Sequence, residues 1–470
     1  MAQIDLLSSV LREIRPSPGT AKSVESAAED FRLEIQKILD KIMERGVVEV
    51  QGSVAKGTYL EDGHDIDIFA FYPEDVSREK LEEYTLRLGR EWAEFRGARY
   101  QISYAEHPYV KVEVSLGKIE LGVDVVGAYQ IDQTTNLKSS VDRTRFHTDY
   151  VRKRMTSTLR DQVLLTKKFM KGTGVYGSEI RVGGFSGLLC EVLTIDSGSF
   201  MELVKSASGW STGQVVDVEK LNPDAGKDFQ APLVVVDPTD GSRNAGAAVT
   251  VEKVSTFVAA SRAFLEKPGI NFFFPTRRKP FSRGELLRRL ESRGTRILLL
   301  EFKRPDVIDD IIFPQITRMQ KTLRNQLEDN GFMLSGPENG GISEEEGSIS
   351  VLFELAVWQL PRVEKRQGPS VNMAEHAKKF LEKHSRSNPY IEGDRWCVDA
   401  RRKFTRAEDL LEYILGDNPQ GMLPSHLADA IRNGWTMRTD RKAIDSAGPG
   451  ARLMMTEHFA RLYPWQVIEN

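Results

Sequence analysis

The chain has 470 residues, of which 40% are hydrophobic and 28% charged, and its net charge is −3 at neutral pH. At about 100 to 200 residues per domain, this length predicts three domains or so, and the charge excludes a uniformly basic coat for nucleic acid. Only two cysteines are present, Cys190 and Cys397, far apart and without a Cys-x-x-Cys pattern, so neither zinc nor disulfides are expected. No apolar run has the length of a membrane span and the N-terminus has no signal-peptide core, so a cytoplasmic protein without a membrane partner is expected.

The first region reads as helices followed by a sheet. Two helices are predicted before residue 45, the second over 23–43, separated by a Pro-Ser-Pro-Gly stretch. The β-branched run 47–51 predicts a strand that ends in a Gly52-Ser53 turn, and the segment 65–71 predicts a second strand. A helix over 77–96 and an apolar strand over 121–126 follow. Strands with one helical crossover indicate a mixed α+β domain.

Three aspartates fall on these predicted strands. Asp65 and Asp67 are two residues apart and therefore share one face of their strand, and Asp124 lies in the apolar run that a neighbouring strand would form. Three converging carboxylates raise each other's pKa, so a cation is their natural partner, and Mg²⁺ suits hard oxygen ligands. An Asp-x-Asp pair alone is typical of a solvated strand edge, and Gly-Ser alone of an ordinary turn. Together they predict a two-metal site for attack of a 3′-hydroxyl on the α-phosphate of a nucleoside triphosphate.

The remainder of the chain divides into two further predicted domains. Helices dominate 149–207, and a short strand over 233–236 and a helix over 251–265 follow. From residue 295 the order strand 296–302, helix 311–330 and strand 348–358 indicates a small α+β module of RRM-like shape, without an aromatic signature for base stacking. The acidic, glycine-rich stretch 337–347 is expected to be a mobile hairpin tip. The predicted fold is thus α+β and multidomain, with domains over 1–148, 149–273 and 274–470.

The ordered set of motifs resembles the class I, archaeal CCA-adding enzymes of the nucleotidyltransferase superfamily. Gly-Ser with Asp-x-Asp indicates only the superfamily, and later segments narrow it. These segments keep their order over most of the chain: Tyr104–Val110, Ser140–His147, Val175–Glu179, Gly184–Glu191, Val236–Pro238 with Arg243-Asn244, and Arg304–Asp310.

The resemblance implies roles for individual residues. Asp65, Asp67 and Asp124 match the catalytic carboxylates that hold the metal ions. Glu106 and His107 match a segment near the RNA primer end. The matches to nucleotide-binding positions are Ser53, Lys56, Thr144, His147, Lys167, Tyr176 and Arg243. The implied palm is the first predicted domain, the central helical domain binds nucleotide and tRNA, and the third region binds tRNA.

Two positions depart from the pattern expected in the family. Lys56 stands where arginine is expected, which keeps the charge but loses bidentate geometry, and Arg145 stands where proline is expected. The segment Thr239–Ser242 also predicts a more flexible connection to Arg243 than the family pattern has.

Four of the nucleotide-binding residues have simpler structural alternatives. Lys167 could belong to the solvent-exposed face of its helix, and Tyr176 could be a packing residue at the helix end. His147 could satisfy a local hydrogen bond, and Arg243 could pair with Asp240 on the surface.

The resemblance implies template-independent addition or repair of the 3′-terminal CCA of tRNA, with CTP and ATP as substrates. It also implies two Mg²⁺ ions as cofactors, and the tRNA acceptor end and adjoining stem as the partner. A homodimer is left open. The alternatives are another RNA tailing activity of poly(A) type, and a catalytically silent RNA-binding protein on the same fold. Intact carboxylates at positions 65, 67 and 124 favour an enzyme.

Overall fold

The computed structural model describes residues 2–63, 65–104, 107–116, 119–276, 278–337, 341–417 and 421–466, and Glu106 lies outside them. The chain forms two compact units, one from residues 1–276 with 463–470, the other from residues 277–462. Within the described residues, no helix is long and apolar enough to cross a membrane.

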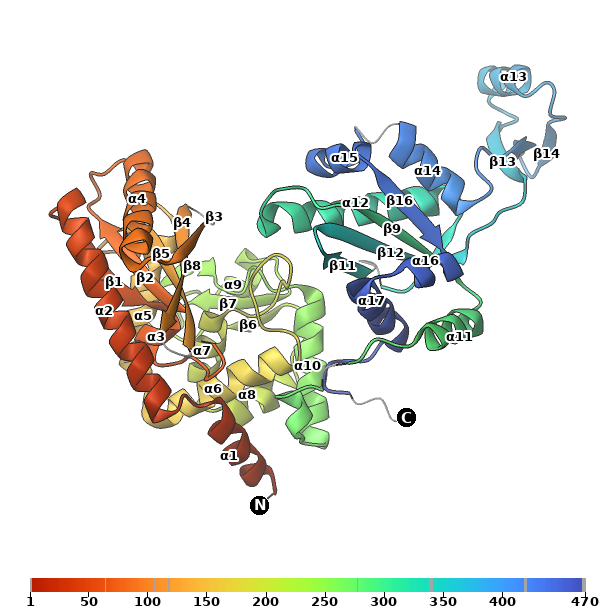
Figure 1. Ribbon diagram of the computed structural model, residues 1–470. Helices are drawn as coiled ribbons and strands as arrows, with labels where there is room; N and C mark the ends of the chain where they lie inside the picture. Colours follow the sequence, from red (N-terminus) through yellow and green to blue (C-terminus); the bar gives the residue numbers. More distant parts are fainter. Residues whose placement is uncertain are drawn as a thin grey trace. The chain divides into compact units, whose positions relative to one another are not determined.

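Unit 1 begins with two helices and a five-stranded sheet (Figure 1). Its first elements are α1 (Ala2–Ile14), α2 (Pro18–Ile42), β1 (Val47–Gln51), α3 (Gly52–Lys56), β2 (Ile66–Tyr72), α4 (Arg78–Arg96), β3 (Arg99–Tyr104), β4 (Pro108–Leu116) and β5 (Ile119–Tyr129). The strand order is β1-β2-β5-β4-β3, and β2 and β5 run parallel while the other neighbours are antiparallel.

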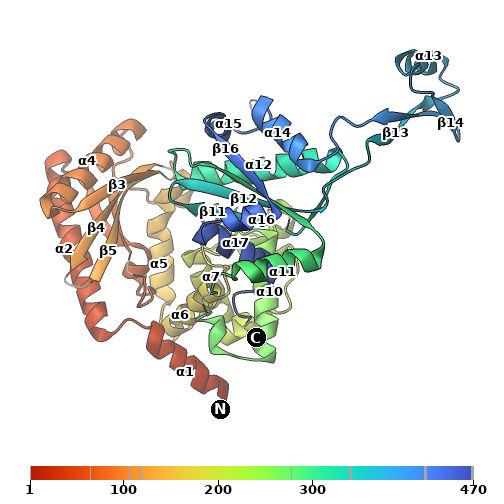
Figure 2. The same ribbon diagram turned by 45° about the vertical axis from the view of Figure 1, so that its right-hand side comes forward.

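The two faces of this sheet have different roles. On β2, Ile66 and Ile68 pack into the core formed with α2 and α4, which lie on one side of the sheet (Figure 2). Phe69 and Phe71 belong to a small cluster on the opposite face, together with Ala128 of β5. Because side chains alternate along a strand, Asp67 shares the second face, away from the main core.

The rest of unit 1 is mainly helical. Its elements are η1 (Thr134–Asn136), η2 (Ser140–Arg143), α5 (Thr144–Arg154), α6 (Ser157–Gly172), α7 (Gly187–Ser197), α8 (Phe200–Ala207), β6 (Gln214–Val216), α9 (Ala225–Asp228), β7 (Leu233–Asp237), β8 (Asp240–Asn244), α10 (Val251–Glu266) and η3 (Ile270–Phe272). Phe169 of α6 stands at the centre of an aromatic core, where it contacts Phe200, Phe264 and Phe272. The C-terminal Trp465 stacks on Phe272 at 5.8 Å.

Unit 2 is an α+β module with a second small sheet. Its elements are α11 (Arg283–Arg293), β9 (Arg296–Lys303), α12 (Asp309–Asp329), β10 (Met333–Ser335), β11 (Gly341–Glu345), β12 (Ser348–Val357), β13 (Val363–Ser370), α13 (Ala374–Lys383), β14 (Tyr390–Glu392), β15 (Arg395–Arg401), α14 (Ala407–Asp417), α15 (Ser425–Arg432), β16 (Trp435–Thr439), α16 (Asp440–Ser446) and α17 (Pro449–Ala460). The main sheet has the order β10-β12-β9-β16, with β11 also paired to β12, and β13-β15-β14 form the second sheet.

Helices cover both faces of the main sheet of unit 2. Leu298 and Leu300 of β9 pack with α12, α14 and α15, whereas Ile297 and Leu299 pack with α11, α16 and α17. The predicted α+β module is confirmed, and its covered sheet agrees with the absence of a base-stacking signature in the sequence.

Two local predictions need correction. The Gly52-Ser53 turn is the start of the short helix α3. The second helix begins at Pro18, not at residue 23, because Ser17 caps it and proline is tolerated in the first helical turn. The expected hairpin is present, since β11 pairs with β12 through a turn at residues 346–347, and residues 338–340 lie outside the described residues.

Candidate active site

The parallel pair β2 and β5 places the three aspartates on one face of the sheet. Asp67 and Asp124 are direct register partners. The carboxylate of Asp65, one residue before β2, lies over Gly122, since a Cβ at Gly122 would be 2.4 Å from Asp65 Oδ1. This is the convergence that the sequence predicts, and it depends on glycine at position 122.

A second glycine lets the chain approach Asp67 closely. Gly52, at the start of α3, has a φ of +65°, and a Cβ there would be 1.7 Å from Asp67 Oδ2. The turn from β1 into α3 therefore lies directly against the carboxylate, and only glycine fits its backbone conformation without strain.

The three aspartates repel one another, and burial raises the pKa values of two of them. Burial, followed by the charges of Asp124 and Asp65, raises the pKa of Asp67 to about 6, although Lys56 and Lys111 act in the opposite direction. Burial and Asp65 also raise the pKa of Asp124, against the charge of Lys111. Asp124 Oδ1 is buried and has no hydrogen-bond partner among the described residues.

These observations fit a divalent cation. A cation would partner the buried oxygen of Asp124 and relieve the repulsion that raises both pKa values. Among the described residues, no three His, Cys, Asp or Glu side chains are grouped closely enough to form a ready metal cage. The fit therefore rests on the unpartnered oxygen and on the chemistry of the donors.

A buried network joins the α3 turn to helices α6 and α7. Glu191 Oε2 accepts from Lys56 Nζ at 2.6 Å, and Glu191 Oε1 accepts from Thr58 Oγ1 at 2.5 Å and from Lys167 Nζ at 2.9 Å. The side chain of Glu191 is 0% exposed and that of Lys167 is 4% exposed. Lys167 thus does not belong to a solvated helix face, and the simpler interpretation of this residue is wrong.

A second buried carboxylate holds two other predicted site residues. Asp237, at the end of β7, accepts at Oδ2 from His147 Nε2 at 2.8 Å and from Arg243 Nη1 at 2.7 Å. Thr239 donates to Oδ1 of the same carboxylate through both its N–H and its hydroxyl. Burial works to raise the pKa of Asp237, but the hydrogen bonds from His147 and Thr239 hold it well below its usual range.

This arrangement decides three of the questions left open by the sequence. Arg243 does not pair with Asp240, which binds Arg143 at 3.0 Å instead. His147 bonds to a residue 90 positions away, so its interaction is not local. The stretch 239–242 is ordered in the β7–β8 hairpin, with Thr239 in the turn and residues 240–242 in β8, and it is held by Asp237 and Asp240, whereas the sequence suggested a flexible connection.

The remaining predicted residues lie around these clusters. Ser53 is in α3, and Thr144 is the first residue of α5, which packs against α3. Tyr176 follows α6, and its hydroxyl lies 3.3 Å from where a Cβ of Gly187 would stand. His107 is 4% exposed, with Nδ1 3.3 Å from Glu82 Oε1, and its Nε2 has no partner among the described residues.

Sequence reasoning assigned no role to two carboxylates that organise the site, Asp237 and Glu191. Both had a signal. Asp237 follows the fully apolar run 233–236, and Glu191 interrupts the apolar helix over 187–197, so each is a charge in a segment that must be buried.

Three family models match consecutive parts of the chain. The nucleotidyltransferase domain matches residues 33–147, the second domain of tRNA nucleotidyltransferase matches residues 161–274, and the C-terminal domain of the CCA-adding enzyme matches residues 293–440. The CCA-adding enzyme of Methanosarcina acetivorans is 37% identical over 87% of this chain and 88% of its own. That of Methanothermobacter thermautotrophicus is 35% identical over 96% of this chain and 98% of its own.

The chain belongs to the CCA-adding enzymes. The matches confirm the archaeal CCA-adding family that the motifs indicated, and with it a tRNA nucleotidyltransferase. Among solved structures, a chain of the Cid1 poly(U) polymerase aligns with 57% of this chain and 97% of its own, at 15% identity and a TM-score of 0.43, too low to bear on the function of this CCA-adding enzyme.

Proposed function

We propose that this CCA-adding enzyme extends the 3′ end of tRNA by nucleotidyl transfer from CTP and ATP, without a template, on the face of β2 and β5 that carries the three aspartates. The observation that carries the proposal is the register pair Asp67 and Asp124, with its unpartnered buried oxygen, in a chain that matches this family over most of its length. Tailing of poly(A) type is not favoured, because the chain belongs to the CCA-adding enzymes. A silent RNA-binding protein is not favoured, because all three carboxylates are present.

Asp65, Asp67 and Asp124 would hold the divalent cations, with Mg²⁺ as the proposed ion. Bound there, two ions would activate the attacking 3′-hydroxyl and neutralise the charge of the leaving pyrophosphate. The contribution of the chain is to keep three carboxylates on one face, with Gly52 and Gly122 leaving room for them.

The nucleotide would lie between the carboxylates and the two buried networks. Ser53 and Lys56 would contact the triphosphate, while Thr144, His147, Lys167 and Tyr176 would lie around the sugar and phosphates. Lys56 supports this placement, because it is bound to Glu191 and is also close enough to Asp67 to lower its pKa.

Arg243 would read the base edge together with backbone groups. Its guanidinium is held by Asp237, which also holds His147, so the donor is oriented before the nucleotide arrives. A base that leaves such an oriented donor unpaired loses binding energy, which is how C and A would be selected over G and U.

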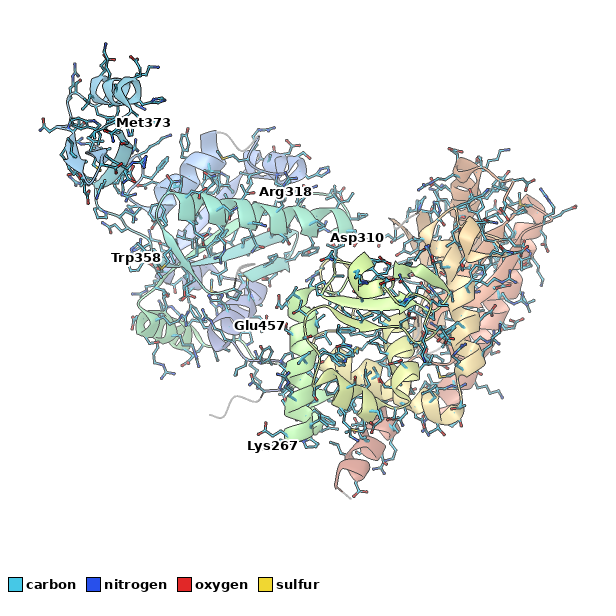
Figure 3. All side chains as sticks on the ribbon, turned by 180° about the vertical axis from the view of Figure 1, so that it is seen from behind. Lys267, Asp310, Arg318, Trp358, Met373 and Glu457 are labelled. Carbon is cyan, nitrogen blue, oxygen red and sulfur yellow. The ribbon has the colours of Figure 1, made fainter. Side chains whose placement is uncertain are left out.

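Glu106 and His107 would lie near the RNA primer end. The acceptor stem would be bound through its shape and its phosphates, because the accessible groove of an A-form helix offers few base contacts that distinguish one sequence from another. Exposed basic side chains of unit 2, such as Arg318 on α12 (Figure 3), are of the type that such contacts need.

The test is incorporation into a tRNA transcript that lacks its CCA, with Mg²⁺ and CTP, ATP or both. Ordered addition of C, C and A that is lost in Asp67→Ala and retained in Asp75→Ala is expected, because Asp75 is an exposed carboxylate paired with Arg45. Addition of A residues alone would point to a tailing enzyme, and tRNA binding without incorporation would point to a silent binder.

A further inference from the structure

Glu191 is the one carboxylate that contacts both predicted nucleotide-binding lysines, Lys56 and Lys167, in the described part of the chain. It lies on α7, Lys56 lies at the end of α3, and Lys167 lies on α6. Lys167 Nζ also donates to the carbonyl and the hydroxyl of Thr58, each at 3.0 Å. Three separate segments of unit 1 therefore meet at one buried carboxylate.

The charge of this cluster matters for the nucleotide. Two ammonium groups share one carboxylate, so this cluster carries one excess positive charge, and through Lys56 that charge also acts on Asp67. Burial alone would raise the pKa of Glu191, yet Lys167, Lys56 and the hydroxyl of Thr58 lower it to about 2, which keeps it ionised. A triphosphate arriving beside Asp67 would meet this excess positive charge.

The hydrogen bonds also require both oxygens of Glu191 to be acceptors. One oxygen accepts from Lys56, and the other accepts from Lys167 and Thr58. A glutamine at this position could accept at one atom only, and its amide N–H₂ would face an ammonium group.

We propose that Glu191 is a positioning residue for the triphosphate: it holds the ammonium group of Lys56 in place to face the phosphates of CTP and ATP alike. Lys167 donates all three of its N–H groups to Glu191 and Thr58, so it fixes the carboxylate and adds its charge from behind. The proposal rests on the proposed function, since it deepens the same site. Its effect concerns the phosphates, which the two substrates share, and leaves the choice of base to Arg243 and Asp237.

The first test is Glu191→Gln, with KM and kcat measured for CTP and for ATP, and with inorganic tripolyphosphate as a competitor that lacks a base. Loss of a charged hydrogen bond predicts a rise of about tenfold or more in both KM values, and in the inhibition constant of tripolyphosphate. The kcat should fall by much less, and the preference for CTP over UTP should stay unchanged.

Glu354→Gln is the matched control. Glu354 lies in unit 2, its side chain is also 0% exposed, and it also accepts hydrogen bonds from several side chains, among them Arg293 at 2.6 Å and His458 at 2.8 Å. This variant should lose stability as Glu191→Gln does, while its KM for CTP stays unchanged. An equal rise in KM in both variants would overturn the proposal, because the effect would then be general destabilisation.

Thr58→Val is a milder second variant in case Glu191→Gln does not fold. It removes the hydroxyl that links Glu191 to Lys167, and a smaller rise in the same constants is expected. Unchanged KM and unchanged tripolyphosphate inhibition in a folded variant would overturn the proposal. Direct calorimetric binding of tripolyphosphate separates this outcome from failure of the proposed function, because it needs no incorporation by the wild type.

Discussion

Replacing Gly52 by alanine tests how strongly the site depends on the close approach of α3 to Asp67. The substitution has two separate costs. A left-handed alanine costs about 1 to 2 kcal/mol of stability. In addition, the new Cβ would stand 1.7 Å from Asp67 Oδ2, whereas real contacts do not fall under 3.0 Å, so the carboxylate has to move by at least about 1.3 Å.

A displacement of about 1 Å in a catalytic group can cost a hundredfold in rate. Gly52→Ala should therefore lower kcat for CTP incorporation by about a hundredfold or more, measured under single-turnover conditions with saturating tRNA.

Gly97→Ala isolates the backbone cost. Gly97 ends α4 with a φ of +62°, and a Cβ there would meet nothing within 4 Å. This variant should lose a similar 1 to 2 kcal/mol of stability from left-handed strain and keep its activity. If Gly52→Ala kept the activity of Gly97→Ala, the close contact with Asp67 would be irrelevant to catalysis and the reasoning would be refuted.

Three further predictions follow from the two carboxylate clusters. The pKa of Asp67 is about 6 in the native state against 3.8 ordinarily, so between these pH values the native state binds a proton that the unfolded state does not. In metal-free buffer above pH 6, the free energy of unfolding of Asp67→Asn should therefore exceed that of the wild type by about 3 kcal/mol, and the difference should vanish below pH 4. A difference that does not depend on pH in denaturant titrations would contradict this. Asp237→Asn releases His147 and Arg243, and the ratio of kcat/KM for CTP over UTP should fall by about tenfold or more; an unchanged ratio would separate Asp237 from base choice. Chelation of divalent cations should stop incorporation while tRNA is still retained in a gel shift, and added Mg²⁺ should restore it; incorporation in excess chelator would exclude the carboxylates as metal ligands.

The strands that carry the three aspartates were predictable because their pattern is local. Asp65 and Asp67 alternate with Ile66 and Ile68, so period-two alternation places the carboxylates on the face opposite the core, and the structure confirms this. That Asp124 reaches the same face needed only that the two apolar runs be neighbours in one sheet, whereas its register opposite Asp67 is a finding of the structure.

Side-chain partners were harder to predict because they are set by packing. Lys167 follows a helical pattern that suits a solvated face, yet α7 covers it and supplies Glu191. Arg243 has Asp240 as its nearest acidic neighbour in sequence, but the hairpin turn directs it to Asp237. Such choices depend on tertiary contacts, which no local periodicity encodes.

The place where unit 2 joins the chain has a topological consequence. Unit 2 is one continuous segment, 277–462, set between two parts of unit 1, and its two ends are adjacent, since Arg278 Nη2 donates to the carbonyl of Leu462 at 2.8 Å. The chain then returns to unit 1, where Trp465 stacks on Phe272. In this sense unit 2 is an insertion into unit 1, and because its two ends are adjacent, the chain enters and leaves it at one place.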